Sequence, residues 1–301
     1  MKKRIKKNKE KLYKQGRGYL KTCGSLVGKD TKQPIPFNSR LKKEYKDLPD
    51  IKEAISKMTA ITGNYLFQLW QGNKNQEGWL IIKNLNAITG VLGITAQRLK
   101  QYLVCLGGYV YPAFYLEKIG KKKNRLSITQ EKLCSIKFNF NLTDDEIERI
   151  SDPKIGTRYL YFIKNKHVTS IEFKPTDTTI KQLKNEGLGN VLVSDSFVAL
   201  CLGLSDMAYK LLCYTGSNKP KGNKISFSKL VKKIHLNLER QLKQQGKPRI
   251  LESIKKGFEE LNNKRHIKHW NYDDQKDEFT WEYTNRIIKH PDFKREENSE
   301  T

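Results

Sequence analysis

The hydrophobic residues between Lys247 and Lys264 follow the three- and four-residue spacing of a helix that buries one face. The apolar positions of this stretch are Ile250, Leu251, Ile254, Phe258 and Leu261. Pro248 suits the first turn of such a helix, where its missing N–H group would have no helical partner. The residues outside the apolar stripe include Lys247, Arg249, Ser253 and Lys256. The pattern therefore predicts an amphipathic helix whose outer face is basic.

Shorter periodic segments surround this helix. The spacing predicts two helices before it and a hairpin of two strands after it. These elements are Asp206–Tyr214, Ser226–Ile234, Arg265–Tyr272 and Phe279–Thr284. In the last segment Phe279, Trp281 and Tyr283 alternate with polar residues, which is typical of a strand with one buried face. The polar run 215–220 predicts a turn between the two helices. Helix, helix, basic helix and hairpin, in this order, indicate a winged-helix domain.

A second helix–turn–helix pattern lies in the first half of the chain. A short helix from Leu85 stops before Gly93, which can take a left-handed conformation, and Thr95 can cap the next helix. The residues expected to face inward are Leu99, Leu103 and Leu106, and those expected to face outward are Gln97, Arg98, Lys100 and Gln101. A helical pattern over 50–72 and an apolar strand over 79–82 precede the pair. A helix pair with a purely structural role is the alternative interpretation.

The residues that follow predict a hairpin, because Tyr109–Ile119 alternates and Arg125–Ile128 returns along it. Its turn holds Lys121, Lys122 and Lys123. Beside a helix–turn–helix, such a hairpin is suited to contact phosphates as a wing, although charged hairpin ends also protect sheet edges. A further hairpin is predicted from residues 157–163 and 168–173, and the polar run 175–189 predicts a connector.

The chain is therefore predicted to be an α+β protein with two tandem winged-helix domains and a basic N-terminal arm. The predicted segments are a basic flexible arm (1–47), an N-terminal winged-helix domain with an extra hairpin (48–175), a linker (176–194), a C-terminal winged-helix DNA-binding domain (195–288) and a polar tail (289–301). A length of 301 residues suits two domains. The two halves share an order of elements without a letter-for-letter repeat.

The formal charge of +26 narrows the class of partner. Basic residues cluster, since residues 219–256 contain only Glu239 and Glu252 as acids whereas residues 257–284 contain more acids than bases. Phosphate neutralisation with counterion release supplies much of the affinity for nucleic acid, so clustered positive charge favours a nucleic-acid partner. An anionic membrane surface is less favoured, because no basic amphipathic helix with bulky exposed apolar residues and no apolar run of about 20 residues is found.

The cysteines, the histidines and the start of the chain give no indication of catalysis, metal binding or secretion. The start of the chain, Met1 to Arg4, leads into charged sequence and not into the apolar segment of a secretory signal. The five cysteines stand singly, which favours free thiols in a reducing cytoplasm. His266 and His269 are three residues apart on a predicted strand, so they point to opposite faces and do not form a zinc pair. We therefore expect a cytoplasmic DNA-binding protein that is not an enzyme and uses no metal or cofactor.

Three segments of the second half carry a resemblance to a known family. Leu204–Leu212 looks like that family's opening helix, Ile225–Leu230 like its second helix, and Arg249–Ile267 like its recognition helix running into a strand. On these residues, and on the tandem arrangement over residues 50–285, the chain resembles the replication initiator (Rep) proteins of theta-replicating plasmids, which bind iterons. The hairpin tip Asp273-Asp274 departs from the family, because acidic residues there would repel phosphates.

The resemblance implies an initiator that binds direct repeats of double-stranded DNA at an origin and promotes local melting. It also implies recruitment of the host replicative helicase and initiator, and a homodimer as one form of the protein. A winged-helix transcriptional regulator, or a replication protein of a phage or mobile element, would use the same residues. An RNA-binding protein is a further alternative, although the exposed sheet aromatics or Gly-rich clamp of such proteins cannot be located.

The predicted contacts follow from side-chain chemistry, because Arg suits guanine, Gln suits adenine and Lys pairs with phosphate. The residues assigned to base edges are Gln97, Arg98, Gln101, Arg249 and Ser253. The residues assigned to phosphates are Lys121, Lys122, Lys123, Lys229, Lys232, Lys233 and Lys247, and Lys100 and Lys256 complete the DNA-binding set. Helices 95–106 and 248–263 are expected to enter successive major grooves on one face of the duplex.

Overall fold

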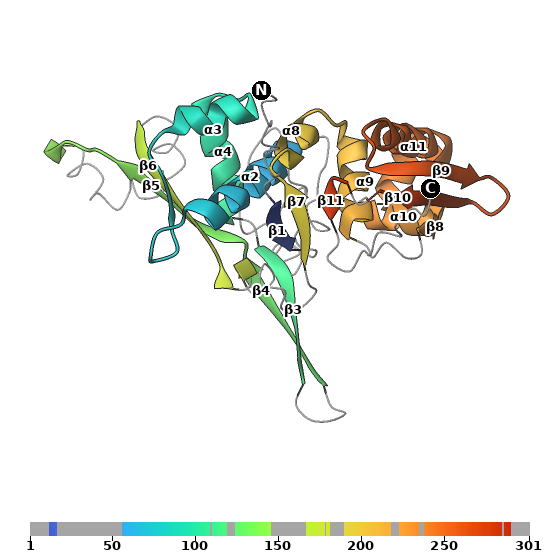
Figure 1. Ribbon diagram of the computed structural model, residues 1–301, viewed down its shortest axis with the longest axis horizontal. Coiled ribbons are helices and arrows are strands. Elements are labelled where there is room, and N and C mark those ends of the chain that lie inside the picture. Colours follow the sequence, from blue (N-terminus) through green and yellow to red (C-terminus); the bar gives the residue numbers. More distant parts are fainter. Residues whose placement is uncertain are drawn as a thin grey trace, which may run out of the picture.

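The computed structural model describes residues 12–16, 56–108, 110–118, 124–145, 167–177, 179–180, 190–217, 223–234, 238–284 and 286–289. These residues form both helices and strands, which confirms the predicted α+β class. Figure 1 shows the helices of residues 57–108 on one side of the molecule and those of residues 206–263 on the other. Strands β1 (Leu12–Gly16), β7 (Asn190–Ser194) and β11 (Ile288–Lys289) lie between them.

The first half begins with the predicted helices and short strand. Its elements are α2 (Lys57–Asn73), β2 (Leu80–Ile82), α3 (Leu85–Leu92), α4 (Ala96–Gly108), β3 (Val110–Lys118), β4 (Asn124–Lys132), β5 (Cys134–Phe140) and β6 (Val168–Pro175). Gly93 ends α3 with a φ of 63°. The Arg98 N–H group donates to Thr95 Oγ1 at 3.3 Å at the start of α4. The predicted glycine stop and threonine cap are both confirmed.

Strand β6 is the centre of the sheet in the first half, which has the antiparallel order β2-β6-β5. Strands β3 and β4 form a separate antiparallel hairpin in which Lys118 lies opposite Asn124, and Figure 1 shows it projecting from the body. This confirms the predicted hairpin. Leu133 alone separates β4 from β5, so one arm of the hairpin continues into the sheet. The predicted partner of β6, residues 157–163, lies outside the described residues, and both edges of β6 carry other strands.

The second half contains all the helices and strands that its periodicity predicts. Its elements are α8 (Phe197–Leu202), α9 (Asp206–Ser217), β8 (Lys224–Ser226), α10 (Phe227–Ile234), α11 (Leu238–Asn263), β9 (Ile267–Asp273) and β10 (Glu278–Tyr283). Strand β10 lies between β8 and β9, with Phe279 opposite both Ile225 and Tyr272. The turn predicted from Thr215 is wrong as far as Ser217, because α9 continues there and the Thr215 hydroxyl donates within the helix to Leu211 O at 2.8 Å.

The three-stranded sheet β1-β7-β11 corrects three predicted boundaries. Residues 12–16 lie in the predicted flexible arm, residues 190–194 in the predicted linker, and Lys289 in the predicted tail, yet all three segments are strands. Val191 and Val193 of the central strand are fully buried, and β7 is paired on both sides. Each segment is too short to show a period by itself, so only pairing across the chain stabilises it.

Helix α2 connects this sheet to both halves. Gln71 exchanges two hydrogen bonds with the backbone of Lys14 in β1, at 2.9 and 2.7 Å. The Lys57 ammonium donates to Leu204 O at 2.5 Å, just before α9. Asn64 and Gln68 of the same helix are buried although they are polar. The buried hydrophobic residues of both halves form one continuous cluster, so α2 lies at the centre of the described structure.

Candidate nucleic-acid interface

The regular part of α11 begins where its N-terminal segment is interrupted. Gly246 has a φ of 71°, which separates the residues from Leu238 to Gln245 from those that follow. A positive φ favours glycine, because a Cβ atom would be strained there. Pro248 then lies in the first turn of the predicted helix, as its chemistry requires. The helical residues before Gly246 were not predicted, although Leu238 and Leu242 have helical spacing.

The predicted apolar stripe of α11 is the face that packs. Ile250, Ile254, Phe258 and Leu261 are buried, and Leu251 is half-buried. The Phe258 ring stacks on Trp270 and Phe279, with ring centroids 5.7 and 5.1 Å apart. The aromatic cluster therefore holds α11 against the hairpin and sets which face of the helix turns outward.

A glycine sets the distance between α11 and α9. A Cβ atom on Gly257 would lie 2.7 Å from Leu211 Cδ1 and 3.0 Å from Met207 Cγ. Further along α11, Glu260 accepts from the N–H and hydroxyl groups of Ser205, at 3.0 and 2.6 Å, at the start of α9. These contacts occupy one flank of α11 near its C-terminal end, away from Lys247 and Arg249.

The opposite face of α11 presents part of the predicted DNA-binding set. Arg249 and Lys256 are exposed, and Ser253 is half-buried between them. Arg249 has no hydrogen-bond or ion-pair partner among the residues that the structure describes. Lys256 forms an ion pair with Glu252 one turn earlier, at 3.4 Å, with both side chains largely exposed. Such a pair contributes little stability and can open when an anion approaches.

Lys247 differs from the predicted phosphate contacts of α10, because its ammonium already has an ion-pair partner. Its ammonium lies 3.0 Å from Asp277 Oδ1 and 5.2 Å from the centre of the Phe227 ring. Asp277 also accepts a hydrogen bond from the Tyr272 hydroxyl, and this bond and the lysine lower the pKa of the carboxyl group. Lys247 therefore connects the start of α11 to the hairpin.

The acidic hairpin tip is folded on itself. Asp273 Oδ1 accepts from the backbone N–H groups of Gln275 and Lys276, at 3.0 and 3.1 Å. These hydrogen bonds and the Lys276 ammonium, 3.1 Å from Asp273 Oδ2, lower the pKa of the Asp273 carboxyl group. The repulsion of phosphate expected from Asp273 is therefore offset in part by Lys276, whereas Asp274 is exposed.

Helix α10 supplies the three remaining predicted cations of the second half. Its buried face consists of Phe227, Leu230, Val231 and Ile234. Lys229, Lys232 and Lys233 lie on its exposed face, and none of them has a hydrogen-bond or ion-pair partner within the described ranges. Since α10 contacts α11, the structure brings these lysines and Arg249 into the same domain.

In the first half, α4 presents a smaller set. Leu99, Leu103 and Leu106 are buried as predicted. Gln97 and Arg98 are exposed, and Arg98 Nη1 lies 3.4 Å from Gln101 Oε1. Lys100 and Gln101 are half-buried, and burial lowers the pKa of the Lys100 ammonium, so this lysine is less outward than predicted. Lys121, Lys122 and Lys123 lie outside the described residues.

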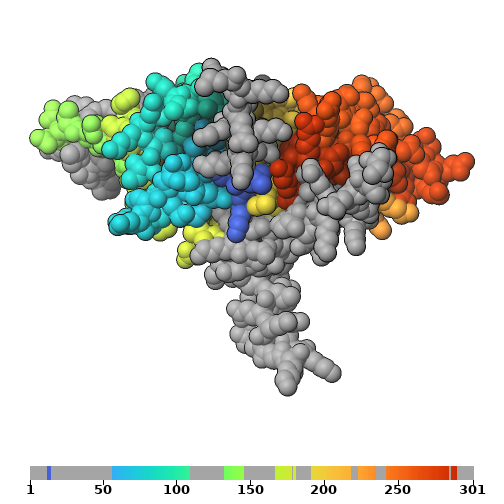
Figure 2. Space-filling view, in the orientation of Figure 1, coloured from blue at the N-terminus to red at the C-terminus, as the bar shows by residue number. Residues whose placement is uncertain are grey.

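The predicted DNA-binding residues of α4 are separated on the surface from those of α10 and α11. Figure 2 shows the blue-green surface of α2–α4 and the orange to red surface of the second half on opposite sides of the molecule. The sequence did not single out one further cation, Lys255.

Lys255 is half-buried on the hairpin side of α11, with its ammonium 4.7 Å from the centre of the Tyr272 ring. Its position next to Ile254 in the helical period could have shown that it borders the packed face.

Comparison of the chain with protein-family models, curated proteins and solved structures finds no match. In the part of the chain that the structure describes, no cluster of three or more His, Cys, Asp and Glu side chains could hold a metal ion. None of the described helices is both long and apolar enough to cross a membrane.

Proposed function

We propose that this chain is a sequence-specific double-stranded DNA-binding protein with two winged-helix domains. The observation that carries the proposal is the second half, where α9, β8, α10, α11, β9 and β10 follow in this order and β8 pairs with β10. The first turns of α11 after Gly246, called its basic first turns below, carry exposed Lys247 and Arg249. In helix–turn–helix proteins the N-terminal residues of the second helix contact base edges, while the preceding helix crosses the backbone. Arg249 suits the first task and Lys232 the second.

The first half supports a second DNA contact. Helices α3 and α4 are joined by a three-residue turn between Leu92 and Ala96, and Arg98 and Gln97 are exposed on the first turn of α4. Arg and Gln are the side chains that pair with guanine and adenine in the major groove. We therefore propose that α4 and α11 read neighbouring parts of one DNA site.

The resemblance to plasmid Rep proteins supports a more specific role. We propose that the protein binds direct repeats at a replication origin, promotes melting of adjacent DNA, and recruits the host replicative helicase and initiator. A homodimer that represses transcription belongs to the same proposal. The apolar face of α11 is buried in the domain, so its basic first turns remain accessible to a partner. Duplex DNA is a polyanion whose major groove is wide enough to admit an α-helix.

Selection of duplexes from a random library tests the proposal directly. We expect one preferred sequence, bound with an affinity that falls steeply with salt, because each neutralised phosphate contributes about 0.9 to the slope of log affinity against log salt concentration. Direct repeats of the selected sequence beside the gene would favour an initiator over a transcriptional regulator. A slope near zero, or selection that enriches no sequence, would contradict the proposal.

We also propose that the protein is a binder and not an enzyme. Incubation of the purified protein with supercoiled DNA and magnesium should leave the DNA unnicked, and ATP should not be hydrolysed. Nicking that survives repurification would place the protein in a different class.

A further inference from the structure

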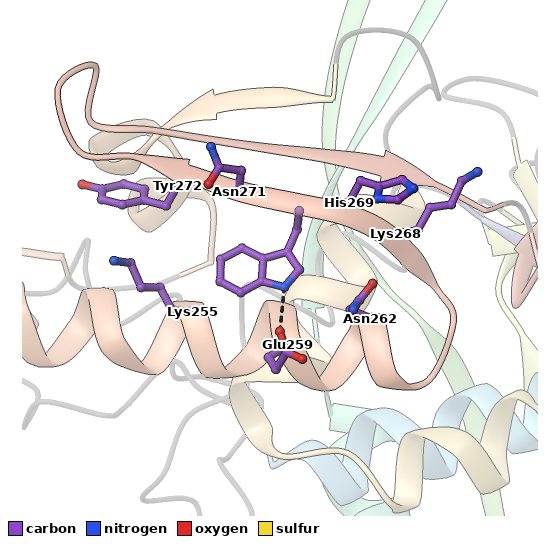
Figure 3. Close-up of a pocket in the computed structure, with 8 residues that line it drawn as sticks. Lys255, Glu259, Asn262, Lys268, His269, Asn271 and Tyr272 are labelled. Carbon is purple, nitrogen blue, oxygen red and sulfur yellow. Dashed lines mark hydrogen bonds between the residues drawn. The ribbon is translucent and has the colours of Figure 1, made fainter.

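A cavity of about 570 Å³ lies between α11 and β9, away from the basic first turns of the helix. Figure 3 shows Lys255, Glu259 and Asn262 on the helix, facing residues of the strand that include His269 and Tyr272. The cavity is an open groove on the surface and not an enclosed pocket, and its volume is large enough for a small ligand. A side chain at every third or fourth position of the helix faces this cavity, so the site uses the flank of α11 that borders the hairpin.

The strand side of the cavity has an unusual backbone. All five consecutive residues from Lys268 to Tyr272 line it, although residues along a regular strand alternate between two faces. His269 has a φ of 51°, and the pairing of β9 with β10 shifts between Thr280 and Glu282. Strand β9 is also an edge strand of its described sheet. Backbone strain of this kind is concentrated at ligand-binding sites, because the surrounding structure has to hold it in place.

The wall of the cavity is aromatic. Trp270 is half-buried, and one face of its indole stacks on Phe258 with the ring planes 19° apart. The indole N–H group donates to Glu259 Oε2 at 3.0 Å, shown by the dashed line in Figure 3. The hydrogen bond and the stack hold the ring in position, and the remaining ring surface can stack on a planar ligand. Tyr272 lies two residues further along the strand, under the Lys255 ammonium.

The polar groups around this wall are few and mixed in charge. Lys255 provides a cation at one end, whereas Lys268 at the other end is paired with Glu282 at 2.8 Å. Asn262 and Asn271 add amide groups that can donate and accept. Glu259 uses one carboxylate oxygen for the indole, which leaves the other as an acceptor. A ligand that matches these groups has a planar ring, a single anionic group and an amino group to donate.

We propose that this cavity binds one nucleotide whose base carries an exocyclic amino group, as cytosine and adenine do. The base stacks on Trp270, its amino group donates to Glu259, and its phosphate pairs with Lys255. Carboxylates accept from the amino group of cytosine in other protein–nucleic-acid contacts. The site is separate from Arg249 and needs no duplex, so it goes beyond the DNA-binding function proposed above. The nucleotide can be free or an unpaired unit of a strand.

Titration of the full chain with dCMP, followed by tryptophan fluorescence, tests the site. We expect saturable quenching with a dissociation constant in the millimolar range and weaker binding of TMP, whose base presents a carbonyl group at that position. Trp270→Phe keeps a ring on Phe258 and should remove the quenching, which assigns the signal among the four tryptophans of the chain. Lys255→Ala should weaken dCMP binding about tenfold, because a charge-assisted contact is lost. The matched control Lys264→Ala, an exposed lysine at the end of the same helix, should bind as the wild type does.

The specificity arm uses Glu259→Gln, which keeps an acceptor for the indole but offers an amide N–H group to the ligand. We expect the preference for dCMP over TMP to be lost or reversed. If a short cytosine oligonucleotide binds much more tightly than dCMP and is equally sensitive to Lys255→Ala, the ligand is an unpaired nucleotide of a strand. If the two bind with equal affinity, the ligand is a free nucleotide. The proposal is overturned if neither probe quenches, if Lys255→Ala and Lys264→Ala behave alike, or if Glu259→Gln leaves the preference unchanged. Duplex binding through Arg249 can persist in each of these cases.

Discussion

The two halves of the molecule share an order of elements, from α2 to β4 in the first and from α9 to β10 in the second, but they pair their strands differently. In the second half, the short strand β8 joins the hairpin that follows the long helix, through β10. In the first half, the equivalent strand β2 pairs with β6, and the β3–β4 hairpin forms a ladder of its own. A shared order of helices and strands therefore does not determine which strands meet.

The halves also differ in how the two helices of the pair are joined. Gly93 ends α3 in a left-handed conformation and leaves three residues before α4. Between α10 and the regular part of α11 the chain instead contains further helical residues, from Leu238 to Gln245, and a break at Gly246. A local glycine stop produces the first connection, and a glycine within one long helix produces the second.

The third difference concerns charge at the helix that each half presents. The Arg98 guanidinium of α4 donates to Gln101 Oε1 at 3.4 Å, at the outer limit of a hydrogen bond. In α11, Lys247 is held by Asp277 of the hairpin, and Arg249 is left as the outward cation. Because the ion pair of Lys247 fixes this part of α11 to its hairpin, we expect the second half to contribute more to sequence selection.

The largest change in stability is expected at Gly257, where α9 packs closely against α11, and the smallest at an open glycine of the first half. Gly257→Val would place side-chain atoms against Leu211 and Met207, and we expect a loss of about 3 kcal/mol in the free energy of unfolding. The matched substitution is Gly90→Val on α3, where a Cβ atom meets nothing within 4 Å. That change should stay within about 0.5 kcal/mol. Urea denaturation of both variants measures the difference, and equal losses would mean that α9 and α11 are not in close contact.

The next effect compares the two helices proposed to read bases. Arg249→Ala should cost about 1–3 kcal/mol on the selected DNA sequence and much less on random duplex. Arg98→Ala should show the same pattern with a smaller loss, because the Arg98 guanidinium is already hydrogen-bonded to Gln101. The sites are far apart, so the double variant should lose the sum of the two within about 0.5 kcal/mol. Fluorescence anisotropy with both duplexes decides this, and a uniform loss on all sequences would remove Arg249 from base reading.

A smaller and sequence-independent effect is expected on α10. Lys232→Ala should weaken binding to selected and random DNA alike and reduce the salt slope by about one. Lys74→Ala at the end of α2, whose ammonium lies over the Trp70 ring, is the control that should leave the slope unchanged. Binding at several salt concentrations measures both variants. A change in sequence preference with Lys232→Ala would mean that α10, and not α11, lies in the groove.

The smallest effect concerns the hairpin contact that distinguishes α11. The folded-state pKa of Asp277 is lowered, so its contribution to stability is present above the pKa of an unfolded aspartate, about 3.9, and is lost as pH falls through the folded value. Asp277→Asn should therefore lower the free energy of unfolding by less than about 1 kcal/mol at neutral pH. In strong acid the variant should have the same stability as the wild type. Asp274→Asn, at an exposed position, is the control.

Thermal melts of the wild type and both variants from neutral to acidic pH measure this difference. Release of Lys247 in Asp277→Asn should also increase the magnitude of the salt slope for DNA by up to about 0.9. A stability difference that grows on acidification would have the wrong sign for this ion pair.

The sequence predicts those parts of the fold that depend on residues close to one another in the chain. The Gly93 stop, the Thr95 cap and the apolar stripe of α11 each depend on residues within a few positions of one another, and all three are found. The outward positions of Arg249 and Arg98 follow from the same stripes. The cavity beside β9 could not be predicted, because it depends on the shifted register at His269 and on the way α11 and β9 pack on each other, neither of which leaves a periodic pattern in the sequence.

The sequence by itself thus determined the helices and hairpins that carry a clear local period, and the concentration of positive charge, since periodicity, caps and composition act over short distances. Only the tertiary structure decided that Leu12–Gly16 and Ile288–Lys289 join the two edges of β7, that β2 pairs with β6, and that Lys247 is held by Asp277. The physical reason is the same in each case. A short strand or a single lysine has no stable partner until segments distant in the chain are brought together by burial of the core.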